Sequence, residues 1–114
     1  MSPLSPSQAE QIARLNDRFR TTLIGGQILL TEGIGALPDE ARAEILLAVA
    51  TFADFSEDND PYGEHDFGAI DHAAAGRVFW KIDYYAADLM SGSENPADPA
   101  STRRVLTIML ASEY

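Results

Sequence analysis

Cysteine is absent from this chain of 114 residues. Its absence excludes a disulfide framework and thiolate metal sites, and nothing else in the sequence indicates an oxidising compartment. Long apolar runs are absent too, since none approaches the ~20 residues that a membrane span needs. The amino terminus has neither the basic region nor the apolar region of a signal peptide. We therefore expect a cytoplasmic protein that has no membrane partner.

Positive charge is scarce. Eight Lys and Arg residues face 18 Asp and Glu residues, which gives a net charge of −10. Between Asp54 and Asp98 there are eleven acids and only Arg77 and Lys81, so this segment carries −9 of that charge. Because a field of this sign repels nucleic acid, we expect no direct nucleic-acid binding. The expected partners are cations or a basic surface on another protein, and solubility alone is the plainer alternative.

Two helices are predicted in the first half of the chain. Ser7 and Glu10 have the spacing of a capping box at the start of a helix over residues 7–19. Apolar residues recur at helical spacing over residues 38–52, which predicts the second helix. A short apolar run over residues 28–31 lies between them and predicts a strand.

Three strands are predicted in the second half. Apolar residues alternate over residues 78–85, with residues 64–70 as a hairpin partner. The run 105–110 is apolar on both faces and predicts a buried central strand, although a helix over 103–112 remains the alternative. Residues 1–114 are thus predicted to form a single acidic α+β domain. Its fold is a small antiparallel sheet of three to four strands with two helices packed on it, in the order α-β-α-β-β-β.

The densest cluster of candidate ligands lies in residues 57–66. Hard cations need several oxygen ligands from a flexible backbone, and this segment contains carboxylates, an amide and an imidazole. It is not an EF-hand, because Ala69 occupies the twelfth position counted from Asp58. The favoured interpretation is a solvated loop whose Asp and Asn side chains brace their own turns, with metal binding as the alternative. If the loop binds a metal, the predicted ligands are Asp58, Asp60, Glu64 and His65.

His65 could serve as a general base if a carboxylate oriented its imidazole. Asp83 on the next predicted strand is one possible partner, but a hydrogen bond to the local backbone is the favoured interpretation. The sequence contains no Gly-x-Ser-x-Gly elbow and no phosphate-binding glycine loop. No complete set of catalytic residues is recognisable, so the sequence leaves open whether the protein is an enzyme.

Several segments together resemble a small bacterial domain-of-unknown-function family of about this length. The resemblance rests mainly on Asn59-Asp60-Pro61-Tyr62-Gly63-Glu64-His65-Asp66-Phe67-Gly68, Trp80-Lys81-Ile82-Asp83-Tyr84-Tyr85, Pro96-Ala97-Asp98-Pro99 and Val105-Leu106-Thr107-Ile108-Met109-Leu110. It implies a small cytoplasmic protein, often encoded on plasmids and integrative elements, but no established activity. The chain departs from the family pattern at Ala86 and Asn95, where the family has acids, which counts against a metal role there. Small acidic proteins on mobile elements are often antagonists of host defence, and some imitate the charge of DNA.

We therefore predict a non-catalytic interaction protein that binds a basic surface of a nucleic-acid-handling protein. One alternative is a metal-dependent hydrolytic enzyme that uses the Asp58–Asp66 loop, and another is a structural or regulatory subunit, with a homodimer left open. No cofactor is predicted apart from a divalent cation in the first alternative. The predicted partner-binding residues are Glu57, Asp58, Asp60, Glu64, Asp66, Asp83, Asp88, Glu94 and Asp98.

Overall fold

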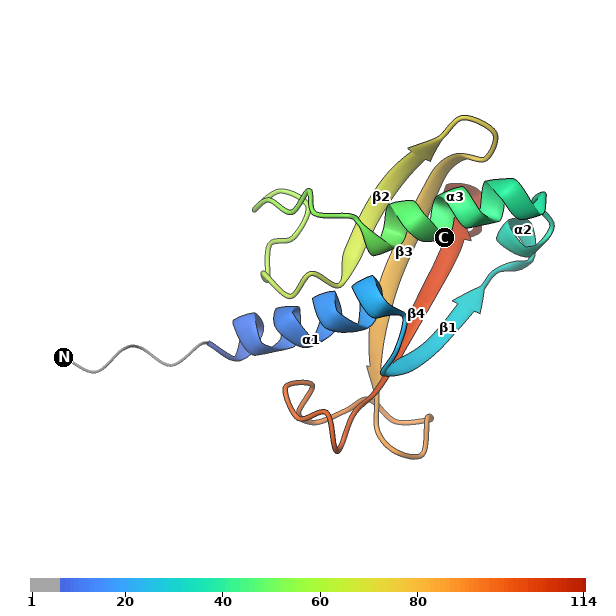
Figure 1. Ribbon diagram of the computed structural model, residues 1–114. Helices are drawn as coiled ribbons and strands as arrows, with labels where there is room; N and C mark the ends of the chain where they lie inside the picture. The colour runs from blue at the N-terminus through green and yellow to red at the C-terminus, as the bar shows by residue number, and fades with distance from the viewer. Residues whose placement is uncertain (1–6) are drawn as a thin grey trace.

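The computed structural model describes residues 7–114 as three helices, a four-stranded sheet and a final 3₁₀ turn (Figure 1). The expectation of no signal peptide falls on residues 1–6, which lie outside the described residues. The elements, in chain order, are α1 (Gln8–Thr22), β1 (Gly26–Leu30), α2 (Glu32–Gly35), α3 (Asp39–Ala50), β2 (Phe67–His72), β3 (Gly76–Tyr85), β4 (Arg103–Leu110) and η1 (Ala111–Glu113).

The α+β class and the order of the main elements are confirmed. Ser7 is the N-cap of α1, and its side chain accepts a hydrogen bond from the backbone N–H of Glu10 (3.1 Å). The open choice over residues 103–112 is settled, because β4 is a strand. The single helical turn α2 was not predicted, since four residues are too few for a periodic pattern.

The sheet is mixed, in the order β1-β4-β3-β2. The pairs β2–β3 and β3–β4 are antiparallel as expected, but β1 runs parallel to β4. A parallel pair needs a long connection, and here residues 31–102, between the end of β1 and the start of β4, supply it. The short run that forms β1 carries no signal for strand direction, so the sequence could not reveal this pairing.

The helices α1 and α3 lie across one face of the sheet (Figure 1). The core between the two layers contains side chains from both helices, from α2 and from the inward positions of β3 and β4: Phe19, Ile34, Ile45, Val49, Val78, Trp80, Ile82, Leu106 and Ile108. Trp80 is fully buried at the centre, and its indole passes directly over Gly68 of β2. A Cβ atom at Gly68 would lie 2.3 Å from Nε1 of Trp80, so only glycine fits there.

The opposite face of the sheet contains Phe67, Phe79 and Tyr114 in edge and tilted ring contacts. Within residues 7–114 no helix packs on this face, apart from the short turn η1 at one end. None of the helices in these residues combines the length and the apolar character of a bilayer-spanning segment. The candidate region for a functional site is therefore the side of the molecule that bears α1 and the long loops.

Candidate functional site

Two acid-rich loops lie at one end of the molecule, with α1 between them (Figure 1). We call residues 53–66, between α3 and β2, the first acidic loop, and residues 86–102, between β3 and β4, the second acidic loop. Asn16 on α1 donates to the carbonyl oxygen of Glu64 in the first loop (2.9 Å), and Gln8 donates to Asn95 Oδ1 in the second (3.4 Å). The helix thus contacts both loops.

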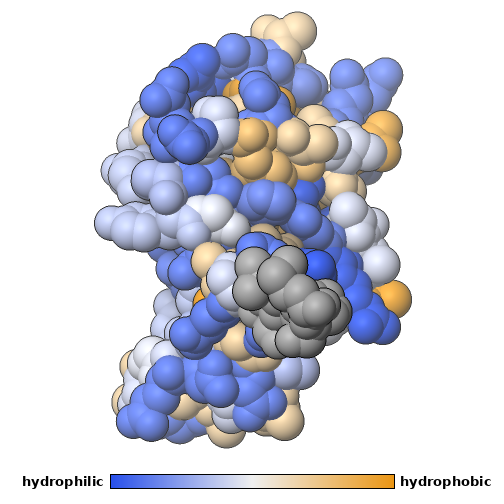
Figure 2. All heavy atoms as spheres, turned by 90° about the vertical axis from the view of Figure 1, so that its left-hand side faces the viewer, coloured by the Kyte–Doolittle hydropathy of each residue, from blue (hydrophilic) through white to orange (hydrophobic). Residues whose placement is uncertain are grey.

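This end of the molecule is mainly hydrophilic in Figure 2. The predicted partner-binding acids differ in their exposure. Four are exposed (Glu57, Asp58, Asp88 and Glu94), four are half-buried (Glu64, Asp66, Asp83 and Asp98), and Asp60 is buried. We call the two loops and the exposed side of α1 between them the acidic face. The sequence had left open whether the two loops approach one another, and the structure brings them to the same end.

Carboxylates gather around Asp66, where the first acidic loop enters β2. Burial raises the pKa of the Asp66 carboxyl, and the charges of Glu64, Asp60 and Asp83 raise it further, while the backbone N–H of Asp66 lowers it. Tyr84 bridges part of this cluster, because its hydroxyl donates to Glu64 Oε1 (2.9 Å). Burial raises the pKa of Tyr84 as well, so the phenol stays neutral and remains a donor.

Replacing Asp66 with asparagine is expected to raise the free energy of unfolding at about pH 7. Since the pKa of Asp66 is higher in the folded chain than the ordinary value of 3.8, the folded state binds this proton more tightly than the unfolded state does. Ionised Asp66 therefore destabilises the fold. This loss of stability is fully present at pH values above the raised pKa, decreases as the pH falls through that pKa, and is absent below pH 3.8. Urea unfolding of both proteins across this pH range measures the difference.

The matched control is Asp71→Asn, at an exposed acid on β2. A hydrogen bond from Arg77 and the charge of Arg77 lower the pKa of Asp71, so ionised Asp71 contributes stability above 3.8 that is lost as the pH falls. Asp71→Asn should thus slightly lower stability at neutral pH, opposite in sign to Asp66→Asn. If both variants change stability in the same direction, the carboxylate cluster does not act as described.

Neither the possible pairing of His65 with Asp83 nor the favoured bond from its ring to the local backbone is found among residues 7–114. His65 does not lie on a strand: it is a loop residue with φ of 56°, in the left-handed region. Its Nδ1 donates to Asp17 on α1 (2.9 Å to Oδ2), and its Nε2 lies 3.7 Å from Asp60 Oδ2. The ring stacks on Phe55 with 3.9 Å between centroids. His65 therefore fastens the first acidic loop to α1.

Asp17 is the functional partner that the sequence did not reveal. It lies 48 residues before His65 and on a different element, and a search along the strand could not reach it. The sequence contains one indirect signal: Asp17 comes shortly before two arginines, Arg18 and Arg20, and only Arg20 pairs with it (3.0 Å). An acid placed beside a buried arginine is fixed in position and can orient a further residue.

Asn59 and Asp60 brace the first acidic loop, as the sequence interpretation suggested. Asn59 accepts from the backbone N–H of Ser56 (2.7 Å) and donates to the carbonyl oxygen of Asp54 (2.7 Å). Asp60 accepts from the backbone N–H of His65 (3.2 Å). In residues 7–114 no group of three or more His, Asp or Glu side chains is arranged to hold a metal ion. The metal alternative at Asp58, Asp60, Glu64 and His65 stays a prediction.

The acids of the second acidic loop also shape their own turns. Asp88 accepts from the backbone N–H groups of Met90 (2.9 Å) and Ser91 (3.0 Å), and these bonds hold its pKa below the usual range. Asp98 accepts from the N–H of Ala100 (3.0 Å). Their negative charges are therefore held at fixed places on the surface.

An open groove of about 660 Å³ lies between α1, α3 and the first acidic loop. Its lining combines the apolar side chains Leu47 and Phe55 with the Asp17–His65 pair. Leu47 is 65% exposed, which is high for a leucine in a helix that otherwise packs on the core. This groove adjoins the acidic face and was not predicted from the sequence.

A family model described as a protein of unknown function, DUF3768, matches residues 30–113. The chain belongs to this family. The match covers both acidic loops and β2 to β4, whereas α1 precedes it. No curated protein and no solved structure matches the chain. For this DUF3768 protein, function must therefore be argued from the site.

Proposed function

We propose that this DUF3768 protein is a non-catalytic binding protein for a basic surface on another protein, specifically a nucleic-acid-handling protein. The observation that supports it is the position of the two acidic loops on either side of α1, at one end of the molecule (Figure 1). A surface of one sign attracts a surface of the other and speeds their encounter. DNA mimicry by a mobile-element antagonist of host defence is the finer form of this proposal.

Fixed charges favour this function over simple solubility. Asp88 and Asp98 accept backbone hydrogen bonds, and Glu64 accepts one from Tyr84, so these carboxylates do not sample many rotamers. These acids then lose less conformational entropy when a partner binds than freely rotating acids would. Glu57 and Asp58 are exposed in the first acidic loop, and they add negative charge to the acidic face.

Reversing the charge at the tip of the first acidic loop is expected to weaken partner binding about tenfold or more. The double variant Glu57→Lys/Asp58→Lys is compared with the native chain as bait in a nuclease-treated bacterial lysate at low salt. Both residues are exposed, and among residues 7–114 their side chains form no hydrogen bond. We expect the native chain to retain a nucleic-acid-handling protein and the variant to release it.

The matched control is Glu40→Lys, which changes an exposed acid at the start of α3, at the far end of the molecule (Figure 1). This variant should retain the partner. Raising the salt from about 0.1 M to about 0.5 M should release the partner from the native chain, because screening shortens the reach of exposed charges. Retention that ignores salt, or an equal loss in Glu40→Lys, would contradict the proposal.

The alternative of a structural subunit depends on the other side of the sheet. Phe67, Phe79 and Tyr114 lie there without a covering helix among residues 7–114. A stable homodimer formed through these residues would favour that alternative.

A further inference from the structure

A buried guanidinium without an acidic partner lies between α1 and β4. Arg104 is 4% exposed, its Nε donates to Asn16 Oδ1 (2.8 Å), and one terminal nitrogen, Nη2, donates to the carbonyl oxygen of Pro96. The guanidinium also lies over the ring of Tyr84, 5.3 Å from its centroid. Within residues 7–114, no carboxylate lies within 4 Å of this guanidinium, and Nη1 has no hydrogen-bond acceptor.

Three other arginines, Arg14, Arg18 and Arg103, also form no ion pair among residues 7–114, but they are exposed, whereas Arg104 is buried. Arg20, Arg42, Arg77 and Lys81 each form an ion pair with an aspartate. A buried charge normally has such a partner, because removal from water is costly for an unpaired ion. Burial lowers the pKa of Arg104, while charge interactions with Tyr84 and with Glu64, which is not in direct contact with the guanidinium, raise it.

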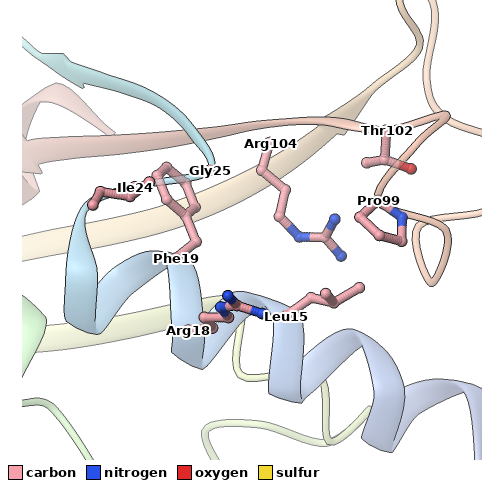
Figure 3. Close-up of a pocket in the computed structure, with 8 residues that line it drawn as sticks. All are labelled: Leu15, Arg18, Phe19, Ile24, Gly25, Pro99, Thr102 and Arg104. Atoms are coloured by element: carbon pink, nitrogen blue, oxygen red, sulfur yellow. The ribbon is translucent and has the colours of Figure 1, made fainter.

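Arg104 lines a half-enclosed pocket of about 220 Å³, shown in Figure 3. Its guanidinium points toward α1, where Leu15 lies, with Pro99 and Thr102 beside it (Figure 3). The apolar walls are Leu15, Phe19, Ile24 and Pro99. Arg18, an exposed residue of α1, supplies a second guanidinium to the lining, and it too has no ion pair among residues 7–114.

We propose that this pocket binds a small organic carboxylate, with its anionic group at Arg104 and Arg18 and its apolar body against Leu15, Phe19 and Ile24. A carboxylate suits the site because its two oxygens match the planar donors of a guanidinium. The pocket volume corresponds to roughly seven water molecules, which is room for one small ring or a short chain. The net charge of −10 disfavours an anion of higher charge, such as a phosphate.

The pocket adjoins the second acidic loop, which contributes Pro99 and Thr102 to its lining, but its charged groups are arginines. A carboxylate bound there would form the direct ion pair that Arg104 does not have among residues 7–114. Gly25, whose φ is 110°, forms part of the lining, and a Cβ atom added there would meet no atom within 4 Å. The pocket therefore has open space beside its apolar end.

The test uses the full chain labelled with ¹⁵N, with benzoate as the probe and benzamide as a neutral probe of the same shape. We expect saturable chemical-shift changes centred on Gly25, Thr102 and the Arg104 Nε–H, with a dissociation constant on the order of 1 mM for benzoate. Arg18→Gln should weaken benzoate binding by about tenfold, since a charge-assisted contact is lost. Arg14→Gln, one turn earlier on the exposed side of α1, should leave it unchanged.

Each other outcome would overturn the proposal. Equal shifts with benzamide would mean that the pocket takes apolar rings regardless of charge. Stronger binding of inorganic phosphate at the same amides would exclude the carboxylate assignment. Shifts centred on other residues, no saturation, or an equal effect of Arg14→Gln and Arg18→Gln would show that benzoate is held by charge in general and not by this pocket.

Discussion

Replacing Arg20 with methionine is expected to lower the free energy of unfolding by about 2–4 kcal/mol. Arg20 is 2% exposed on α1 and reaches to the end of α3, where Nη1 donates to the carbonyl oxygens of Val49 (2.7 Å) and Ala50 (3.3 Å). The last carbonyls of a helix lack intrahelical partners, and the helix dipole favours a cation there. Methionine keeps the apolar stem but provides no donor.

The destabilisation caused by Arg20→Met should extend beyond α3. The Arg20 guanidinium lies 4.9 Å from the Trp80 ring centroid and 5.4 Å from that of Phe55, and it pairs with Asp17. Asp17 in turn holds His65. One side chain thus connects α1, α3, the core and the first acidic loop. We expect amide hydrogen exchange to accelerate in residues 53–66 of the variant, because the loop loses the orientation of its anchor.

Urea unfolding and thermal melts measure the effect, and each kcal/mol corresponds to about 4 °C in a chain of this size. Arg14→Met is the matched control, at an exposed arginine of the same helix, and should stay within about 0.5 kcal/mol of the native chain. Arg20→Lys keeps the charge but loses the planar set of guanidinium donors. Its free energy of unfolding should therefore lie between those of the native chain and Arg20→Met. The Nε–H of Arg20 has no acceptor among residues 7–114, and this unpaired group reduces the net stability that Arg20 contributes to the native chain. Native stability in Arg20→Met would refute this role.

The sequence predicted the elements whose signals are local. The capping box at Ser7 marked the start of α1, and the alternation over residues 78–85 marked β3 with Trp80 facing inward. The run 105–110 was apolar on both faces, and Val105 and Met109 on one face and Leu106 and Ile108 on the other are indeed buried. These patterns arise from contacts within one helix or along one strand, so a single sequence is enough to show them.

The contacts that build the candidate site are not local. His65 was misplaced because its positive φ turns the chain before β2 begins, and its partner Asp17 lies on a helix 48 residues away. The buried state of Arg104 was equally hidden, since a pair of arginines in a sequence is most often exposed. No rule of spacing connects α1 to β4 or to the first acidic loop. Only the folded arrangement shows that α1 supplies partners to both.

Replacing Asn16 with alanine should cost more than any other single change considered, about 3–5 kcal/mol of unfolding free energy. Asn16 is fully buried, and all of its polar atoms are used. Its Nδ2 donates to the Glu64 carbonyl oxygen (2.9 Å) and to the Tyr84 hydroxyl (2.8 Å), and its Oδ1 accepts from Arg104 Nε (2.8 Å). Alanine would leave a buried guanidinium N–H and a carbonyl oxygen without partners, and buried unpaired groups are the costly case.

A double-mutant cycle with Tyr84→Phe separates the hydrogen-bond network from simple packing. Tyr84→Phe alone removes the hydroxyl that accepts from Asn16 and donates to Glu64, and should cost less, about 1–2 kcal/mol. Since the two residues share a bond, the double variant should lose less than the sum of the single losses, by about 1 kcal/mol. Asn95→Ala, at an exposed asparagine of the second acidic loop, should be nearly neutral. Strict additivity of Asn16→Ala and Tyr84→Phe would mean that the hydrogen bond between these two residues adds no stability. The cost of Asn16→Ala would then come from its packing and from its bonds to Glu64 and Arg104.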